Sequence, residues 1–466
     1  MKSNNKQQAL LVILTAATFA VSCRVTKPYK QPENVADSKL YRDSTTTDST
    51  TMADLPWTQL FTDPHLQALI KEGIENNLDL QVATARLEAA AANLRQSKQA
   101  FLPTAEATAS VTQQKVAISQ GGSFITYNRT YELSATASWE ADIWGKLRST
   151  KRSYMAALLQ SEAYRRAVLT QLIANIATNY YALLAYDEQL KLTRQTVENR
   201  KADVETMKTL KESDVVTGAD VVQSEANRYS AEVTIPDLLQ NIRETENTIS
   251  VYLGRSPGTI DRGTLAEQSI NVDLKTGVPA QLLANRPDVQ EAEYQLRYYY
   301  ELTNVARTYF YPSLSITATG GLNGTSLNNY FDASHLFGSI VGSLTQPIFK
   351  QGQNKQRLRV AEANQKEYLA TYKSTLLSAG QEVTNALFDY NAAIDKASIR
   401  GQQITYLQKS VDYTKELLKY TSNTNYTDVL TSEQSLLTAQ LNSISDKLQQ
   451  LQAVVTLYRS LGGGWK

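Results

Sequence analysis

The sequence predicts a mainly α-helical, internally duplicated chain that also carries pairs of membrane β-strands. Three observations support this fold class: a long internal repeat, period-2 strands in each copy, and extended helical segments after them. An offset of 209 residues carries Asp79 onto Asp288, and an offset of 208 carries Asp220 onto Asp428. Such a unit is far longer than a solenoid repeat, so each copy is expected to be one structural half.

The N-terminus is typical of an exported lipoprotein. Lys2 and Lys6 precede an apolar stretch, Ala9–Val21, which predicts a signal peptide at residues 1–22. The tetrapeptide that ends at Cys23 resembles a lipobox, and Cys23 is the only cysteine of the chain. We expect acylation at Cys23, with an incidental thiol as the alternative. Several acyl chains would hold the mature protein at a membrane.

Composition excludes several function classes. The formal charge falls from +1 to −1 when Lys2 and Lys6 are removed with the signal, which does not favour a nucleic-acid partner. Only His65 and His335 occur, without companions at metal-ligand spacing, and no nucleophile elbow or phosphate loop is present. The carboxylates of Glu140 and Asp142 are expected to be solvated. We therefore predict no catalytic site, no metal and no cofactor.

The predicted organisation follows the repeat. A lipid anchor, tether and equatorial segment cover 23–62, and an equatorial connector covers 255–277. The first repeat occupies 63–254 with a strand pair at 104–143, and the second occupies 278–461 with a strand pair at 313–348. Residues 462–466 form a C-terminal tail.

Each repeat is expected to contain a helix, two strands and a long helical hairpin. The helical segments are predicted at 65–101, 145–211, 220–253, 279–311, 352–420 and 428–461. A 3-4 spacing of apolar residues predicts a coiled-coil seam in the fifth of these, or a core stripe of an ordinary bundle. Its residues are Leu369, Tyr372, Leu376, Ala379, Val383, Ala386, Tyr390, Ala393 and Ala397.

The strands alternate between an apolar and a polar face. Tyr131, Ala135 and Trp139 are expected to meet lipid. The opposite face is expected to meet water in a lumen, and its candidate residues are Glu106, Thr108, Glu132, Thr136 and Glu140. A soluble β-sandwich is the alternative, because period 2 alone does not separate the two. Four strands cannot close a spanning barrel, whereas three chains supply twelve.

Five short motifs occur in order along both halves: Ala100–Pro103, Ser138–Arg148, Arg286–Val289, Phe310–Ser313 and Leu344–Phe349. Together they resemble the TolC-like outer-membrane efflux proteins, in particular the lipoprotein (NodT-type) branch of the outer membrane factor family. The resemblance implies a homotrimer with a 12-stranded outer-membrane β-barrel, continued by a long periplasmic α-helical barrel. It also implies a passive exit duct, opened by a periplasmic adaptor (membrane fusion) protein. An inner-membrane pump of the resistance-nodulation-division type would power it.

In that family acidic side chains ring the periplasmic end of the helical hairpins. The resemblance makes Asp428, Asp220 and Asn425 candidate gate residues in this sequence. Helix capping is the alternative role of the two aspartates, and both roles can coexist. Asn425 stands where relatives carry an acid, so the ring is expected to be less charged here.

Two other functions remain open at this point. A lipid-anchored periplasmic coiled-coil adaptor would also have long helical hairpins, although adaptors lack duplicated amphipathic strand pairs. An enzyme on a helical scaffold is disfavoured by the missing catalytic groups.

Overall fold

The structure is a computed structural model of the 466-residue chain, and it contains two compact units. Unit 1 comprises residues 1–32, 87–161 and 292–372, and unit 2 comprises residues 33–86, 162–291 and 373–466. Both units therefore draw on both halves of the sequence. The structure describes residues 25–32, 40–42, 50–118, 124–269, 277, 281–420 and 426–466. Cys23 and Asn425 lie outside the described residues.

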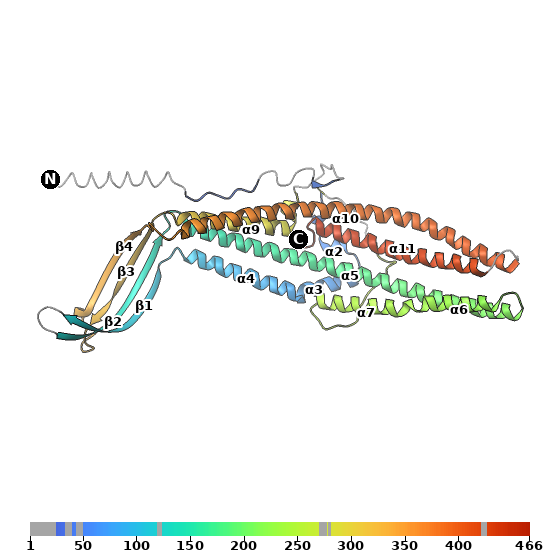
Figure 1. Cartoon of the computed structure of the whole chain (residues 1–466), viewed down its shortest axis with the longest axis horizontal. Coiled ribbons are helices and arrows are strands. Elements are labelled where there is room, and N and C mark those ends of the chain that lie inside the picture. The colour runs from blue at the N-terminus through green and yellow to red at the C-terminus, as the bar shows by residue number, and fades with distance from the viewer. Residues whose placement is uncertain are drawn as a thin grey trace. The chain divides into compact units, whose positions relative to one another are not determined.

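Unit 1 contains one antiparallel sheet in the order β1-β2-β3-β4 (Figure 1). Its strands are β1 (Thr104–Ile118), β2 (Phe124–Ala141), β3 (Ser313–Gly324) and β4 (Leu336–Thr345), with the 3-10 turn η4 (Ala333–His335) before β4. The two predicted hairpins are present, one from each half. β2 pairs with β3 from Tyr131–Gly324 to Ala141–Leu314, and this pairing joins the two halves of the sequence.

Helices make up most of the described chain. Short elements at the start of unit 2 are η2 (Met52–Asp54) and α2 (Trp57–Leu60). The helices of the first half are α3 (Pro64–Asn76), α4 (Leu78–Gln99), α5 (Lys146–Glu212), α6 (Gly218–Glu232) and α7 (Thr234–Tyr252). The helices of the second half are α8 (Leu282–Asn285), α9 (Pro287–Thr308), α10 (Gln353–Tyr420) and α11 (Tyr426–Ser460).

Three of the predicted helices are interrupted, so the prediction of continuous segments is wrong there. Asn77 separates α3 from α4 with an extended backbone, φ −61° and ψ 129°. Arg286 separates α8 from α9, where the following Pro287 disfavours a helical conformation. Val233 separates α6 from α7, and Pro236 just beyond it cannot donate a helical hydrogen bond.

The interruptions at Asn77 and Arg286 are copies of one another. The Asn77 side-chain amide donates to the Tyr252 carbonyl at 2.9 Å, and the Arg286 guanidinium donates to the Ser460 carbonyl at 3.0 Å. Tyr252 and Ser460 are the last residues of α7 and α11. The duplication is therefore visible in tertiary contacts inside unit 2.

A glycine two residues after each of these helix ends is also repeated in the two halves. Gly254 and Gly462 both have positive φ, 68° and 89°. A Cβ atom would lie 2.3 Å from the Asn76 carbonyl oxygen at Gly254, and 2.3 Å from the Asn285 carbonyl oxygen at Gly462. Both the backbone conformation and the close approach require glycine at these two equivalent places.

The predicted seam of α10 is buried over most of its length. Its central residues are at most 2% exposed: Tyr372, Leu376, Ala379, Val383, Ala386 and Ala393. Ala397 is exposed, so the seam ends one position earlier than its pattern predicts.

Segments outside the long helices pack on unit 2. The Asp63 carboxylate caps α3 and accepts hydrogen bonds from the Tyr180 hydroxyl at 2.6 Å and the Gln268 amide at 2.7 Å. Tyr458 donates to the Leu55 carbonyl at 2.6 Å. An equatorial collar built from these segments stays a prediction.

Within the described residues, every helix is too short or too polar to cross a lipid bilayer.

Candidate functional site: the sheet and the hairpin ends

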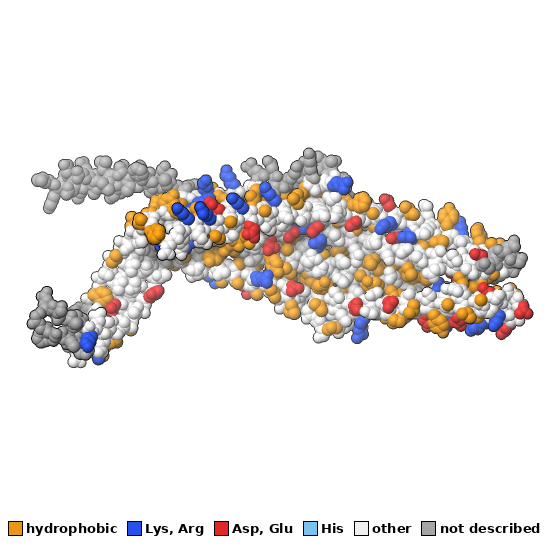
Figure 2. All heavy atoms as spheres, in the orientation of Figure 1, with side chains coloured by type: hydrophobic (Ala, Val, Ile, Leu, Met, Phe, Trp, Pro, Cys, Tyr) orange, Lys and Arg blue, Asp and Glu red, His pale blue; other side chains and the backbone are white. Residues whose placement is uncertain are grey.

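One face of the sheet in unit 1 is polar. The strand register pairs Glu106 with Thr136, and Thr136 with Thr319, so the five candidate residues Glu106, Thr108, Glu132, Thr136 and Glu140 share this face. The Thr136 and Thr319 hydroxyls lie 3.1 Å apart, which closes a hydrogen bond across β2 and β3. In Figure 2 the visible face of the sheet is largely white with some acidic side chains. In β4 the pattern is weaker, because Val341 and Phe337 take polar-face positions.

The opposite face is apolar and exposed. Its paired positions include Leu133 with Leu322, Trp139 with Ile316 and Leu314 with Leu344. Ile340 is 80% exposed and Leu336 is 69% exposed. A soluble fold would bury such a face, so its exposure marks it as a surface for an apolar partner.

The apolar face has the height of a membrane-spanning sheet. Ala141 and Tyr131 are ten residue steps apart on β2. At about 3.3 Å per residue and a tilt of about 40°, those steps rise about 25 Å, the usual apolar band of an outer-membrane protein. Beyond Tyr131 the same face becomes polar, and the Arg129 guanidinium donates to the Gln113 side chain at 3.2 Å.

The carboxylates at the foot of the sheet are paired with cations. Lys146 donates to both Glu140 oxygens at 3.0 Å, and the Arg148 Nε atom lies 2.9 Å from the Asp142 carboxylate. β2 ends at Ala141, so Asp142 is not on the strand with Glu140. Each acid has its own cation, and they form no joint acid–base pair.

The hairpin ends of unit 2 hold the gate candidates. At the first end, between α5 and α6, Thr217 and Asp220 form a capping box. The Asp220 carboxylate accepts from the Thr217 backbone N–H at 2.8 Å and from its hydroxyl at 2.7 Å. Asp220 therefore has the capping role that we named as its alternative.

At the second end, between α10 and α11, Asp428 is the third residue of its helix, as Asp220 is in α6. Asp428 lies in the first turn of α11 and is exposed. A carboxylate in this turn is favoured by the helix dipole. The structure brings Asp220 and Asp428 to repeat-equivalent places on α6 and α11, and it does not describe Asn425.

An apolar cluster is formed by residues from both hairpin ends. Met207, Tyr426, Val429 and Leu430 are buried, and Leu210, Val216, Val221 and Leu418 pack against them. The Tyr426 and Ser224 hydroxyls are 3.0 Å apart. Burial raises the pKa of Tyr426 to about 12, so the phenol stays neutral at physiological pH.

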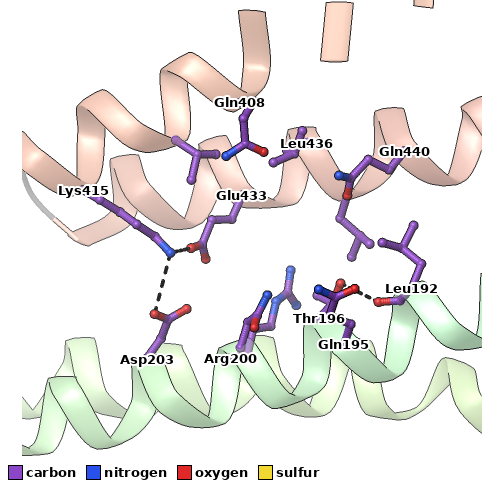
Figure 3. A pocket seen from close by; sticks show the side chains of 13 residues that line it. Leu192, Gln195, Thr196, Arg200, Asp203, Gln408, Lys415, Glu433, Leu436 and Gln440 are labelled. Atoms are coloured by element: carbon purple, nitrogen blue, oxygen red, sulfur yellow. Dashed lines mark hydrogen bonds and ion pairs between the residues drawn. The ribbon is translucent and has the colours of Figure 1, made fainter. Parts of the chain in front are cut away.

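A charged cavity of about 270 Å³ lies between α5, α10 and α11, farther from the hairpin ends than this cluster. Figure 3 shows Arg200 and Asp203 of α5 facing Lys415 and Glu433 across the gap. Arg200 is 5% exposed and donates to Gln434 of α11 at 2.8 Å and to the Asn227 carbonyl of α6. Arg200 thus connects three helices.

Lys415 forms ion pairs with residues of both hairpins. Its ammonium pairs with Glu433 of α11 and lies 3.9 Å from the Asp203 carboxylate of α5. Burial raises the pKa of Asp203, and the Glu433 carboxylate adds to the rise, while Lys415 and Arg200 oppose it. Burial is the largest effect on Lys415 and lowers its pKa, but the hydrogen bond to Glu433 and the charges of Glu433, Asp203 and Asp412 together raise the net pKa. The Asp203 Oδ2 atom is buried and lacks a hydrogen-bond partner among the described residues.

Sequence reasoning missed Arg200, Asp203 and Lys415. Polar residues on long helices are usually solvated, so nothing near them in the sequence marked them. Glu433 gave a usable signal, because the dipeptide Ser432-Glu433 repeats Ser224-Glu225 at an offset of 208.

Known proteins resemble the chain over nearly its whole length. The sequence model of the outer membrane efflux protein family matches residues 69–255 and 278–463. The probable efflux pump outer membrane protein TtgC of Pseudomonas putida is 28% identical over 472 residues, 98% of this chain and 96% of that protein. The probable outer membrane lipoprotein SilC of Salmonella typhimurium is 26% identical over 464 residues, which are 98% of this chain and 98% of that protein.

Solved structures share the fold. The outer-membrane channel OprN is 25% identical with a TM-score of 0.87, over 95% of this chain and all of that one. The open MtrE channel of Neisseria gonorrhoeae is 26% identical with a TM-score of 0.85, over 95% of this chain and 99% of that one. Matches in both halves, together with the two-faced sheet, show that this chain belongs to the outer membrane efflux protein family and is an outer-membrane protein.

Proposed function

We propose that three copies of this chain assemble into the passive exit duct of a tripartite efflux system. The observation that carries the proposal is the sheet, which has one polar face and one apolar face. Its outer strands, β1 and β4, each have one edge that pairs with no other strand of the described residues. In lipid those outer strands must be paired. Four strands per chain cannot close a cylinder, and twelve strands can.

In this assembly the apolar face meets lipid and the polar face lines the lumen. Glu106, Thr108, Glu132, Thr136 and Glu140 then meet water inside the duct. Their repeated hydroxyls and carboxylates give the lumen a polar, acidic wall. The match of both halves to channel structures favours this duct over the adaptor alternative.

The partners are a periplasmic adaptor and an inner-membrane pump of the resistance-nodulation-division type. Relatives of similar identity are named as efflux pump outer membrane proteins for toluene, for antibiotics and for pyoverdine export. Such different cargoes on one fold support a duct that does not select its substrate. The pump would make that choice.

The hairpin ends form the gate in this proposal. Three symmetry copies of Asp428 would surround the lumen and favour cations there. Asp220, whose carboxylate caps α6, contributes structure at the first end. Acylation of Cys23 would hold each copy at the membrane.

Neighbouring residues of β1 provide a direct test of the two faces. Thr108 and Ala107 are both exposed and lie on opposite faces of the sheet. We expect Thr108→Cys channels in planar bilayers to lose current when a cationic methanethiosulfonate reagent is added. Ala107→Cys channels should keep their current. Equal responses of the two variants would refute the lumen assignment, and a lack of channels from the wild-type protein would refute the duct.

A further inference from the structure

The end of the sheet away from the helices has an excess of positive charge. Residues 107–131 include Lys115 and Arg129 but no Asp or Glu, and residues 313–335 include a single acid, Asp332. Figure 2 shows basic side chains at this end of unit 1. The foot of the sheet is different, because Lys146 and Arg148 are each paired with a carboxylate there.

Arg129 lies on the apolar side of the sheet. It is two residues from Tyr131 on β2, so its side chain is on the same face as Leu133 and Trp139. The apolar band of that face spans about 25 Å from Ala141 and ends at Tyr131. In the orientation that we propose for the sheet, Arg129 is therefore at the height of the lipid headgroups, in the leaflet opposite the helices.

Neutral groups hold the guanidinium of Arg129. Its Nη2 atom donates to Gln113 Oε1 at 3.2 Å, and its Nη1 atom donates to the Tyr131 hydroxyl at 3.4 Å. Among the described residues, neither of these acceptors is a carboxylate. A guanidinium has five N–H donors, so further donors remain for an anion. Phosphate is an anion whose oxygens match the planar fork of arginine.

A polar pocket of about 420 Å³ lies beside this guanidinium. One wall consists of Gln113, Arg129 and Tyr131 of the sheet, and the other consists of residues 325–328 of the β3–β4 loop. The loop wall supplies two hydroxyl groups, an amide and one apolar side chain. Hydroxyl and amide groups both donate to and accept from sugar hydroxyls, whereas the cation binds a phosphate. The pocket therefore has the groups that a phosphorylated sugar requires.

The loop wall is fixed on the sheet. Tyr330 is 7% exposed, and its hydroxyl donates to the Leu322 carbonyl at 2.8 Å. Within the loop, the Asn328 backbone N–H donates to the Ser326 hydroxyl at 3.2 Å, and Asn329 turns the chain with a φ of 61°. Asparagine tolerates this left-handed conformation. The pocket is therefore formed before any ligand enters.

An exposed apolar surface adjoins the pocket on the same face of the sheet. Val111 is paired with Tyr131 and is 64% exposed. Leu133 is 43% exposed, and Leu336, which is paired with Leu322, is 69% exposed. A free sugar phosphate would leave this surface in contact with water, whereas the acyl chains of a lipid would cover it. The combination of pocket and surface therefore favours a lipid.

We propose that this pocket binds the phosphorylated sugar headgroup of a lipid in the leaflet opposite the helices. Arg129 contacts the phosphate, Gln113 and residues 325–328 contact the sugar, and the acyl chains lie along Leu133 and Leu336. The inference rests on the proposed function, in which the apolar face of the sheet meets lipid. Its consequence is that the bound lipid fixes the height of the sheet in the membrane.

The test uses the full-length protein in detergent, with diphosphoryl lipid A as the probe and native mass spectrometry as the binding assay. Arg129→Gln removes the guanidinium from the pocket. Arg359→Gln is the matched control, because it removes the same charge from an exposed position of α10. Ser326→Asp keeps an acceptor for the Asn328 N–H and adds a negative charge to the pocket.

Arg129→Gln should weaken the binding of diphosphoryl lipid A by roughly tenfold, and Ser326→Asp should weaken it at least as much. Arg359→Gln should bind as the wild type does. Lipid A without its phosphates should bind the wild-type protein about tenfold more weakly. Diphosphoryl lipid A should also slow hydrogen exchange of residues 325–330 in the wild type, and Arg129→Gln should lose this protection.

Three results would overturn the proposal. The first is equal affinity of Arg129→Gln and Arg359→Gln for diphosphoryl lipid A. The second is an equal loss of phosphatidylglycerol binding in Arg129→Gln, which would show a general surface for anionic lipids. The third is equal protection of residues 325–330 by inorganic phosphate alone, which would show a site for a free anion.

Planar-bilayer currents from the same wild-type preparation separate this proposal from the proposed function. Channels without binding that depends on Arg129 overturn the lipid site alone. A wild-type protein that forms no channels contradicts the proposed function instead.

Discussion

The two hairpin ends of unit 2 are copies in sequence but differ in their charge contacts. At the first end, Glu225 pairs with Arg228 of its own helix and with Lys208 of the adjoining α5. At the second end, the equivalent Glu433 pairs with Lys415, which also reaches Asp203 of the first hairpin. Glu225 thus forms ion pairs within the first hairpin only, whereas Glu433 pairs with a lysine that also contacts the other hairpin.

The two equivalent glutamates also differ in burial. The Glu433 side chain is 15% exposed and that of Glu225 is 32% exposed. The duplication therefore preserved the helices and the Ser-Glu dipeptide, while the partners of the acids diverged. We infer that the second hairpin is held in place by the first, and that variants of the two ends will have unequal effects.

The largest effect is expected for Arg200→Ala. Arg200 is 5% exposed and bonds to α6 and α11, so its loss leaves buried acceptors without a donor. Local opening of α11, followed by hydrogen exchange, should become easier by about 2–3 kcal/mol, and closed-channel leak should rise. Arg228→Ala is the control and should change little, because Arg228 pairs only along its own helix at i,i+3 in the described contacts. Similar effects of the two variants would remove the distinction between the ends.

The next largest effect is expected for the repeat-equivalent acids Glu433 and Glu225. Glu433→Gln should weaken closure of the hairpin ends by about 1 kcal/mol, since the partner Lys415 is partly exposed to solvent. Glu225→Gln should cost less than about half as much. The measurement is the frequency of spontaneous opening in planar bilayers. Equal opening frequencies of the two variants would show that the contact between Lys415 and Asp203 does not stabilise the closed state.

Variants of the two aspartates test the capping role of Asp220 and the proposed gate role of Asp428. Asp220→Ala removes the capping box and should destabilise the start of α6 by about 0.5–1 kcal/mol, measured by hydrogen exchange, with unchanged ion selectivity. Asp428→Ala should lower cation selectivity, measured from reversal potentials in asymmetric salt. Unchanged selectivity in Asp428→Ala would leave that residue with a helix-terminal role alone.

The smallest effect concerns pH. Burial raises the pKa of Asp203 above its ordinary value, so the folded chain binds this proton more tightly than the unfolded chain does. The stability from this group is therefore present at low pH and is lost as the pH rises through the folded pKa. Asp203→Asn should flatten the acidic pH dependence of the hairpin contact and change its stability at neutral pH by less than about 1 kcal/mol. Glu225→Gln should leave that dependence unchanged. A steeper dependence in Asp203→Asn would contradict the assignment.

Much of the fold followed from local patterns in the sequence. The strands of the first hairpin were predictable because Ala, Thr, Ser and Glu alternate over many residues of β1 and β2. β4 was less clear, since Phe337 and Val341 place apolar groups on the polar face. The helix interruption at Asn77 was missed because its neighbours favour helix, and the bond that stabilises it reaches Tyr252.

The charged cavity could not be found in the same way. Arg200 and Gln434 are 234 positions apart, and Asp203 and Lys415 are 212 apart. Each residue by itself is compatible with a solvated helix face, so only the tertiary packing assigns it a partner. The gate candidates, in contrast, came from family resemblance, and for Asp220 the structure shows a capping role.

The pairing of β2 with β3 also has a consequence for the order of folding. Those strands come from opposite halves, and their eleven paired positions are the backbone connection between the two hairpins of the sheet. Until the chain has been synthesised and exported past Gly324, β1 and β2 form an isolated two-stranded ribbon, which is marginally stable in water. Its apolar side then remains open to chaperones or to misassembly while the residues from Ala141 to Gly324, about two fifths of the chain, are produced. A stop codon between the halves would leave that ribbon permanently unfinished.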